Sequence, residues 1–393
     1  MTQPFASPGR YDFGLTPEQE ATAQRIHREA IVFDLLSQHA GANIFDHYPA
    51  ALREELATTL AQAGNYYEKF LRSVIWPYEV ARRGQSDLIA DWYRQAGVTV
   101  ISHGISVEDI PGHLYDLLVV PYQNLPWFRH VTTAKEMRQA KVDGVIASYA
   151  NCQPDSSIPH DLGAIDLAYR RGLRSLMLTY NNMTTVGVGC TERVDAGLSN
   201  HGVDVVKRCN DIGMIVDVSH CGHETSMDAC RVSTKPVTAN HTCARGLYYH
   251  ARGKSDDCLR AIADTGGVIG IVAVPAFLTD DPAPRIEHML DHIDYVANLV
   301  GWQHVAIGSD WPLQAPRDVL EPIFQPANKI VGFRKEHRLD VTVNLAGFDD
   351  VRDMPNITRG LVKRNWSEQQ IKGVLGENAL RVFENVCDAQ CGR

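Results

Sequence analysis

Residues 214–220, MIVDVSH, form a short β-rich run that ends in histidine, and residues 235–241, KPVTANH, repeat this pattern after one helical segment. Runs that are largely apolar on both faces are typical of strands in a parallel sheet that is covered by helices. Similar runs alternate with amphipathic helical segments along most of the chain. The predicted strands cover residues 31–35, 97–106, 144–152, 174–181, 214–220, 235–241, 267–274 and 304–311.

A TIM-type (β/α)8 barrel is closed by eight strands that are each followed by a helix, and the sequence predicts this number. Gly172, Gly213 and Gly266 follow three of the predicted helices, where a glycine often ends a helix. A doubly wound open sheet is the alternative, but no glycine-rich phosphate-binding turn follows the first strand. We therefore predict an α/β fold with a TIM-type barrel, in a single domain over residues 1–393.

Other segments extend this alternation. Thr16, Pro17 and Gln19 form a capping-box pattern, which predicts a helix leading into the first strand. Residues 42–96 are predicted to be a helical insertion after the first strand, and residues 312–355 a long excursion that covers the barrel mouth. A further capping pattern at Ser367 predicts the closing helix in the extended C-terminal segment.

Composition narrows the class of partner. The chain has 393 residues, 44% of them hydrophobic and 22% charged, and a net charge of −9, which argues against a nucleic-acid partner. No stretch of about 18 apolar residues predicts a membrane span, and the N-terminus lacks the pattern of a secretory signal. The nine cysteines are scattered. We expect a reduced, cytoplasmic protein that acts on a small molecule, without a membrane partner.

Polar residues stand at the ends of several predicted strands, where barrel enzymes carry their catalytic groups. Imidazoles on two adjacent strands and a carboxylate after the eighth suit zinc or a similar divalent cation, with the carboxylate able to bind metal or move a proton. The sequence has no Gly-x-Ser-x-Gly elbow, P-loop or Cys-x-x-Cys pair, so other hydrolytic and redox sites are disfavoured. These strand-end residues are His103, Asn151, Cys152, Tyr180, His220, His241 and Asp310.

Arg252 lies in the segment HARGKSDD, just before a predicted helix. One role is an ion pair with Asp256 or Asp257. The other is a bidentate grip on a substrate carboxylate, for which a guanidinium is well shaped.

Four segments together resemble the renal, or membrane, dipeptidase family of the amidohydrolase-like barrels. They are MIVDVSHCG (214–222), KPVTANHT (235–242), HVAIGSDW (304–311) and LVKRNWSEQQIKGVLGENALRVF (361–383). The likeness runs in order from about residue 31 to residue 385. It implies a TIM-type barrel and, as family members usually are, a dimeric two-zinc dipeptidase.

The resemblance also implies roles for particular residues. His220 matches the metal ligand of the family's Asp-x-Ser-His motif, and His241 matches that of its Ser-His-Ser motif, which here is Asn-His-Thr. Asp310 matches an aspartate that binds metal and takes part in proton transfer. Arg252 matches a residue that binds the substrate carboxylate.

Three regions depart from the family pattern. The first strand keeps Asp34, but Leu36 and Gln38 stand at its two ligand positions. Ala150 or Asn151 stands where the family has a bridging glutamate, and Tyr180 replaces a substrate-contacting histidine. Because leucine cannot bind a metal and neutral amides bind one poorly, we expect one metal or none.

The sequence therefore predicts a hydrolase of a small amide or dipeptide that bears a carboxylate, in a homodimer or higher homo-oligomer. Its single metal would be held by His220, His241 and Asp310, with Cys152 as a possible further ligand. Substrate contacts are expected from Tyr180, Arg252, Asn151 and Gln38. Two alternatives stay open: a metal-independent isomerase, tautomerase or lyase on the same barrel, and a non-catalytic binding protein.

Overall fold

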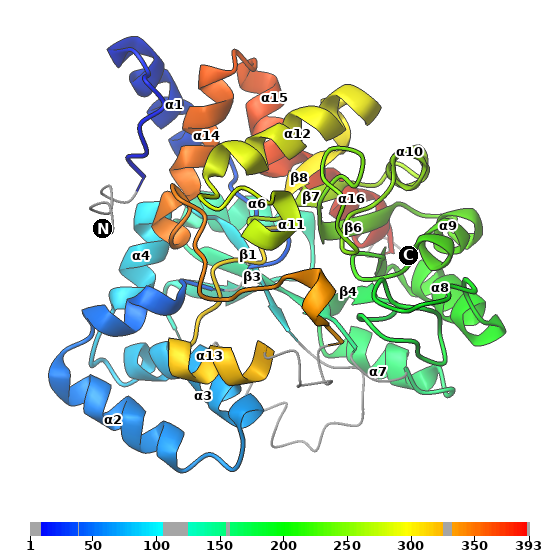
Figure 1. The fold of residues 1–393 in the computed structure, drawn as a ribbon, viewed down its shortest axis with the longest axis horizontal. Helices are drawn as coiled ribbons and strands as arrows, with labels where there is room; N and C mark the ends of the chain where they lie inside the picture. Colours follow the sequence, from blue (N-terminus) through cyan, green and yellow to red (C-terminus); the bar gives the residue numbers. More distant parts are fainter. Residues whose placement is uncertain (1–8, 38, 105–124, 155–157, 325–331, 391–393) are drawn as a thin grey trace.

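A computed structural model describes residues 9–37, 39–104, 125–154, 158–324 and 332–390 (Figure 1). Its centre is a curled parallel sheet surrounded by helices. Strands neighbour one another in the order β1 (Val100–Gly104), β3 (Ile146–Cys152), β4 (Leu173–Met177), β5 (Ile215–Asp217), β6 (Val237–Thr242), β7 (Ile269–Ile271) and β8 (Val305–Ile307).

The predicted first strand closes the gap between the two ends of this sheet. Phe33 forms a parallel bridge with Val100, and Asp34 forms one with Ile307. The backbone N–H of Asp34 donates to the carbonyl of Val100 at 3.0 Å, and that of Leu35 donates to the carbonyl of Ile307 at 2.9 Å. Eight extended segments thus surround one core, and the predicted TIM-type barrel is confirmed.

Several strands are shorter than predicted. The run from Met214 to His220 is strand only over Ile215–Asp217, because the Asp217 carboxylate accepts from the N–H of Ser219 at 3.0 Å and turns the chain. One strand was not predicted at all. This strand, β2 (Phe128–His130), pairs in parallel with the first half of β3.

The helices pack outside the barrel, and most follow a strand, as predicted. Gly172, Gly213 and Gly266 all have positive φ, at 106°, 81° and 83°, and each follows the end of a helix. The helices that follow strands are α6 (Ala134–Asp143), α7 (Gly163–Arg170), α8 (Asn200–Ile212), α9 (His223–Val232), α10 (Asp256–Asp264), α11 (Pro275–Leu278), α12 (Ile286–Val300) and α13 (Arg317–Phe324).

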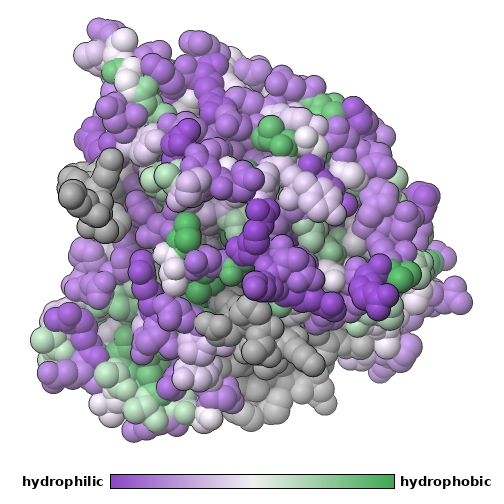
Figure 2. All heavy atoms as spheres, in the orientation of Figure 1, coloured by the Kyte–Doolittle hydropathy of each residue, from purple (hydrophilic) through white to green (hydrophobic). Residues whose placement is uncertain are grey.

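The insertion before β1 is helical, as expected, and the capping box at Thr16 is present at the start of the first helix. Polar side chains dominate the face of the molecule seen in Figure 2, and apolar ones form separate spots. The N-terminal helices are α1 (Pro17–Glu29), α2 (Ala50–Ala61), α3 (Tyr66–Arg82) and α4 (Leu88–Ala96).

The C-terminal segment ends in α14 (Met354–Lys363), α15 (Glu368–Lys372) and α16 (Asn378–Val386). The predicted capping box at Ser367 starts α15. In α16, the ring of Phe383 packs against Phe33 and Tyr149, with centroids 5.6 and 5.0 Å apart. This helix therefore packs against the residues that close the barrel.

The excursion after β8 lies against loops that carry predicted site residues. Phe333 packs on Phe277 with ring centroids 5.9 Å apart, and Nε2 of His250 donates to the carbonyl of His337 at 2.9 Å. A Cβ at Gly332 would come within 2.8 Å of the side chain of Asn181. The described part of the excursion thus contacts the loops after β4 and β6 and the helix after β7.

Candidate active site

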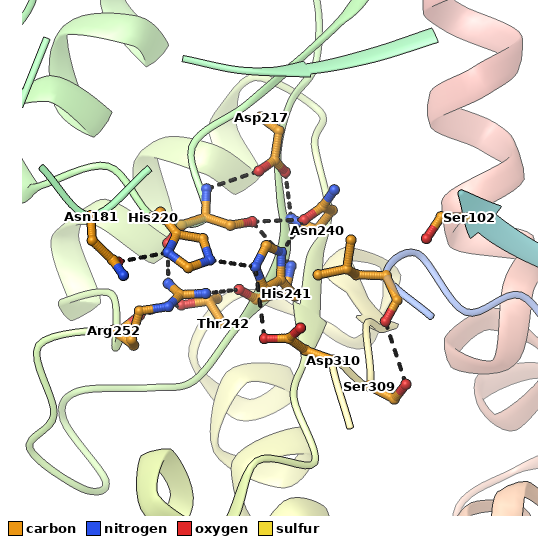
Figure 3. Close-up of polar contacts among 12 residues, drawn as sticks. Ser102, Asn181, Asp217, His220, Asn240, His241, Thr242, Arg252, Ser309 and Asp310 are labelled. Carbon is orange, nitrogen blue, oxygen red and sulfur yellow. Dashed lines mark hydrogen bonds and ion pairs between the residues drawn. The ribbon is translucent and has the colours of Figure 1, made fainter. Parts of the chain in front are cut away.

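His220 and His241 come together at the centre of the site (Figure 3). His220 lies in the turn after β5, and His241 lies near the end of β6. Their Nε2 atoms are 2.8 Å apart, and the side chains are 2% and 0% exposed. The prediction that these strand ends meet is thus supported by their positions.

Asp310 lies on the His241 side of this pair, with its Oδ2 3.9 Å from Nε2 of His241. Its backbone is left-handed, with φ of 50°, and its N–H donates to the carbonyl of Leu36 at 2.8 Å. Such a conformation is uncommon outside glycine and often marks a functional position. The Asp310 side chain is 16% exposed, so it is the most accessible of the three.

The far nitrogen of each imidazole contacts an asparagine. Nδ1 of His220 is 2.7 Å from Oδ1 of Asn181, which follows β4. Nδ1 of His241 is hydrogen bonded to Oδ1 of Asn240 in β6. Neither asparagine was predicted as a site residue, although both stand next to residues that were. Their only sequence signal is a polar amide at the end of an apolar run.

Arg252, in the loop between β6 and α10, is fully buried. Its Nη2 donates to the carbonyl of His241 at 3.0 Å, and its Nη1 donates to the carbonyl of Ser219. The guanidinium therefore joins the backbones that carry the two histidines. Binding of a substrate carboxylate by Arg252 stays a prediction.

The electrostatic setting keeps both histidines neutral. Burial lowers the pKa of His220 and of His241 well below the usual value, and the nearby Arg252 guanidinium lowers both further. Neutral imidazole is the form that binds a metal.

The other predicted site residues surround the pair less closely or lie outside the described residues. The ring of Tyr180 stacks on His220, with centroids 3.9 Å apart and planes inclined by 22°. Asn151 and Cys152 are buried at the end of β3, where Cys152 belongs to the hydrophobic core. Gln38, the fourth predicted substrate contact, lies outside the described residues.

His103 lies near the end of β1 and contacts the neighbouring strand β3. Its side chain is 4% exposed, and its Nδ1 is 2.6 Å from Oγ of Ser148 in β3. The first strand likewise supplies packing. Leu36 is buried with 3% exposure, and the Asp34 carboxylate is hydrogen bonded to Ser309.

The side chains around the histidine pair provide some, but not all, of the ligands that one divalent cation needs. The two Nε2 atoms are 2.8 Å apart, and Oδ2 of Asp310 lies 3.9 Å from Nε2 of His241. Nowhere in the described ranges are three or more His, Cys, Asp or Glu side chains gathered as a complete metal site would need. The residues therefore provide two ligands in position and a third nearby.

A comparison with known protein families shows which family the chain belongs to. The family model for membrane dipeptidase, peptidase family M19, matches residues 21–321 and 329–391. The chain belongs to the membrane dipeptidase family. The resemblance first carried by four short segments is thereby confirmed.

Individual proteins are also similar to this dipeptidase-family chain in sequence or in fold. Dipeptidase verJ of Clonostachys rogersoniana is 30% identical over 256 residues, which are 65% of this chain and 59% of that protein. The match thus spans less than two thirds of that relative's length. The amidohydrolase from Pseudomonas aeruginosa has 25% identity and a TM-score of 0.70, with 93% of this chain and 99% of that chain covered.

A metallopeptidase from Rhodobacter sphaeroides, solved with a phosphinate mimic of the dipeptide L-Ala-D-Ala, shares the fold. Its TM-score is 0.64 at 20% identity, with 91% of this chain and 100% of that chain covered. Among the helices of the described residues, none has the length and apolar character needed to span a membrane.

Proposed function

We propose that this chain is a dipeptidase-like hydrolase of a small amide or dipeptide that bears a free carboxylate. A single zinc or similar divalent cation would be held by His220, His241 and Asp310. Family membership supports the reaction class, and the converging pair of Nε2 atoms, 2.8 Å apart, is the observation that carries the metal site. The predicted homodimer or higher homo-oligomer is part of this proposal.

A divalent cation at this position would supply Lewis-acid activation of an amide carbonyl and of water. The protein's own residues supply the remaining chemistry. Asp310 is suited to accept a proton from the attacking water and pass it to the leaving amine, because its carboxylate is partly exposed beside His241. Tyr180 shields one face of the His220 ring by stacking on it.

The residues of the first strand support a single metal. Leu36 has no donor atom and is buried, and the Asp34 carboxylate is engaged by the hydroxyl and N–H of Ser309. Hydrolysis does not require a second metal, because one zinc can lower the pKa of water to about 7. The alternative is proton transfer without metal, for which the Asp310 carboxylate beside His241 provides a base.

Elemental analysis of protein purified without added metal tests the proposal, together with an assay of dipeptide hydrolysis that includes L-Ala-D-Ala. We expect about one metal per chain, lost together with activity in His220→Ala. His288→Ala is the matched control, because His288 lies on α12 and pairs with Asp281 at 3.6 Å.

Two tightly bound metals per chain would contradict the single site. Activity without any metal would favour the proton-transfer alternative. A protein with neither metal nor activity on any small substrate would overturn the enzymatic proposal and favour the non-catalytic binding protein.

A further inference from the structure

We propose that Asn181 and Asn240 are positioning residues that fix His220 and His241 in the same tautomer. Each imidazole carries its proton on Nδ1, so both Nε2 lone pairs point at one shared position. We infer the tautomers from the contacts that the two asparagine oxygens make with Nδ1 of each ring. Only the last step, that a metal occupies the shared position, rests on the proposed function.

Asn181 determines the tautomer of His220. An amide oxygen can accept a hydrogen bond but cannot donate one, so the 2.7 Å contact with Oδ1 of Asn181 requires a proton on Nδ1 of His220. The thiol of Cys190 donates to the same oxygen at 3.4 Å. The backbone of Asn181 is fixed as well, because Oγ1 of Thr191 donates to its carbonyl at 2.7 Å.

Asn240 determines the tautomer of His241 in the same way, because its Oδ1 faces Nδ1 of His241. The orientation of this amide is set by Ser219. Oγ of Ser219 accepts from the backbone N–H of His241 at 3.1 Å, so its own proton is available to Oδ1 of Asn240 at 2.9 Å. The amide oxygen is thus the atom that faces both Oγ of Ser219 and Nδ1 of His241.

The Asp217 carboxylate supports this arrangement through hydrogen bonds to both strand ends. It accepts from the N–H of Ser219 at 3.0 Å and from the N–H of Asn240 at 2.6 Å. Oγ1 of Thr238 donates to it as well, at 2.8 Å. One buried carboxylate thus ties together the two backbone segments whose side chains orient His241.

The consequence lies at the 2.8 Å contact between the two Nε2 atoms. With both protons on Nδ1, neither Nε2 has a hydrogen to donate, and two lone pairs face each other inside the protein. A divalent cation held by both nitrogens would make this contact favourable. Metal-binding histidines typically donate their other N–H to an oxygen acceptor in this manner, which fixes the ring and its tautomer.

Nitrogen-15 NMR of histidine-labelled, metal-free protein at neutral pH tests the tautomers directly, without reference to activity. We expect both His220 and His241, assigned by His→Ala variants, to show a protonated Nδ1 and a bare Nε2. Asn240→Leu and Asn181→Leu remove the acceptors and should release the proton to Nε2 of the adjacent ring. Asn240→Asp and Asn181→Asp keep an acceptor and should preserve the tautomer.

Binding of zinc alone, measured by competition with a chelator, gives the second readout. The leucine variants should bind zinc about 10- to 100-fold more weakly than the wild type, whereas the aspartate variants should not lose affinity in this way. Asn210→Leu is the matched control. It removes a buried amide whose oxygen accepts from the N–H of Thr234 at 2.6 Å, away from the histidines.

A proton on Nε2 of either ring in the wild type would overturn the proposal, as would an imidazolium sharing its proton with the other ring. Unchanged tautomers in a folded leucine variant would overturn the role of that asparagine. The wild-type spectrum remains decisive if the leucine variants do not fold. If the tautomers are as expected but the protein binds no zinc, the positioning roles are supported and only the proposed metal site is contradicted.

Discussion

Asp34 and Ser309 are joined by two hydrogen bonds although they lie 275 positions apart. The Asp34 carboxylate accepts from the backbone N–H of Ser309 at 2.8 Å and also from its hydroxyl. The next residue, Asp310, donates its N–H to the carbonyl of Leu36. The first strand, which carries leucine at a family ligand position, therefore still helps to place Asp310.

Ser309→Ala should weaken this connection. The buried Asp34 carboxylate loses a hydroxyl donor, and we expect the free energy of unfolding to fall by ~1–3 kcal/mol. Urea unfolding measures the change. Thr58→Ala is the control, because the exposed Thr58 hydroxyl donates to the carbonyl of Glu54 within α2, and its loss should cost less than about 0.5 kcal/mol. Equal losses in the two variants would contradict the role of Ser309.

Gly189→Ala should disturb the loop that carries Asn181. A Cβ at Gly189 would lie 2.1 Å from the carbonyl carbon of Asn181 and 2.3 Å from the carbonyl oxygen of Tyr180, and backbone atoms cannot give way easily. We expect a loss of ~1–3 kcal/mol in unfolding free energy. Gly64→Ala is the control, because its Cβ would come no closer than 3.4 Å to Glu68. A Gly189→Ala protein as stable as this control would show the loop to be displaceable.

His27 should make the protein less stable in mild acid. Burial lowers the pKa of His27 to about 4, while its Nε2 donates to the carbonyl of Ala96 at 2.8 Å. The unfolded chain, with an ordinary histidine pKa of about 6.5, takes up a proton first as the pH falls. Stability from this residue is therefore complete above about pH 6.5 and is lost towards pH 4, by up to ~3 kcal/mol.

Unfolding free energies of wild type and His27→Gln, measured across this range, test the sign. The difference between the two proteins should shrink as the pH falls. A difference independent of pH would show that His27 does not titrate in this way.

Arg252→Lys should separate the two roles considered for this residue. If the guanidinium mainly joins the carbonyls of Ser219 and His241, the variant loses metal affinity and thermal stability together, because lysine cannot reproduce that planar fork. If Arg252 binds a substrate carboxylate, KM rises for dipeptides but not for their C-terminal amides. We expect the first result from the geometry, and a selective KM effect alone would favour the second.

Local patterns in the sequence were sufficient for the barrel and for part of the site. Alternating β-rich and helical runs, with glycines after the helices, predict the architecture because each element must bury its own apolar face. The strand-end rule also predicts His220, His241 and Asp310, because parallel strands bring their carboxyl ends to one edge. The absence of a donor at Leu36 is equally a property of the sequence.

Only the tertiary structure decided how those residues are oriented. The packing of neighbouring strands brings the Oδ1 atoms of Asn181 and Asn240 to the Nδ1 atoms of the two histidines. Closure of the barrel joins Asp34 to Ser309. The unpredicted β2 depends in the same way on pairing with β3. Such contacts link segments far apart in the chain, and no local propensity encodes which backbone will lie opposite a given side chain. The sequence by itself determined which chemical groups reach the barrel mouth, and the folded register decided which atom of each group faces the next.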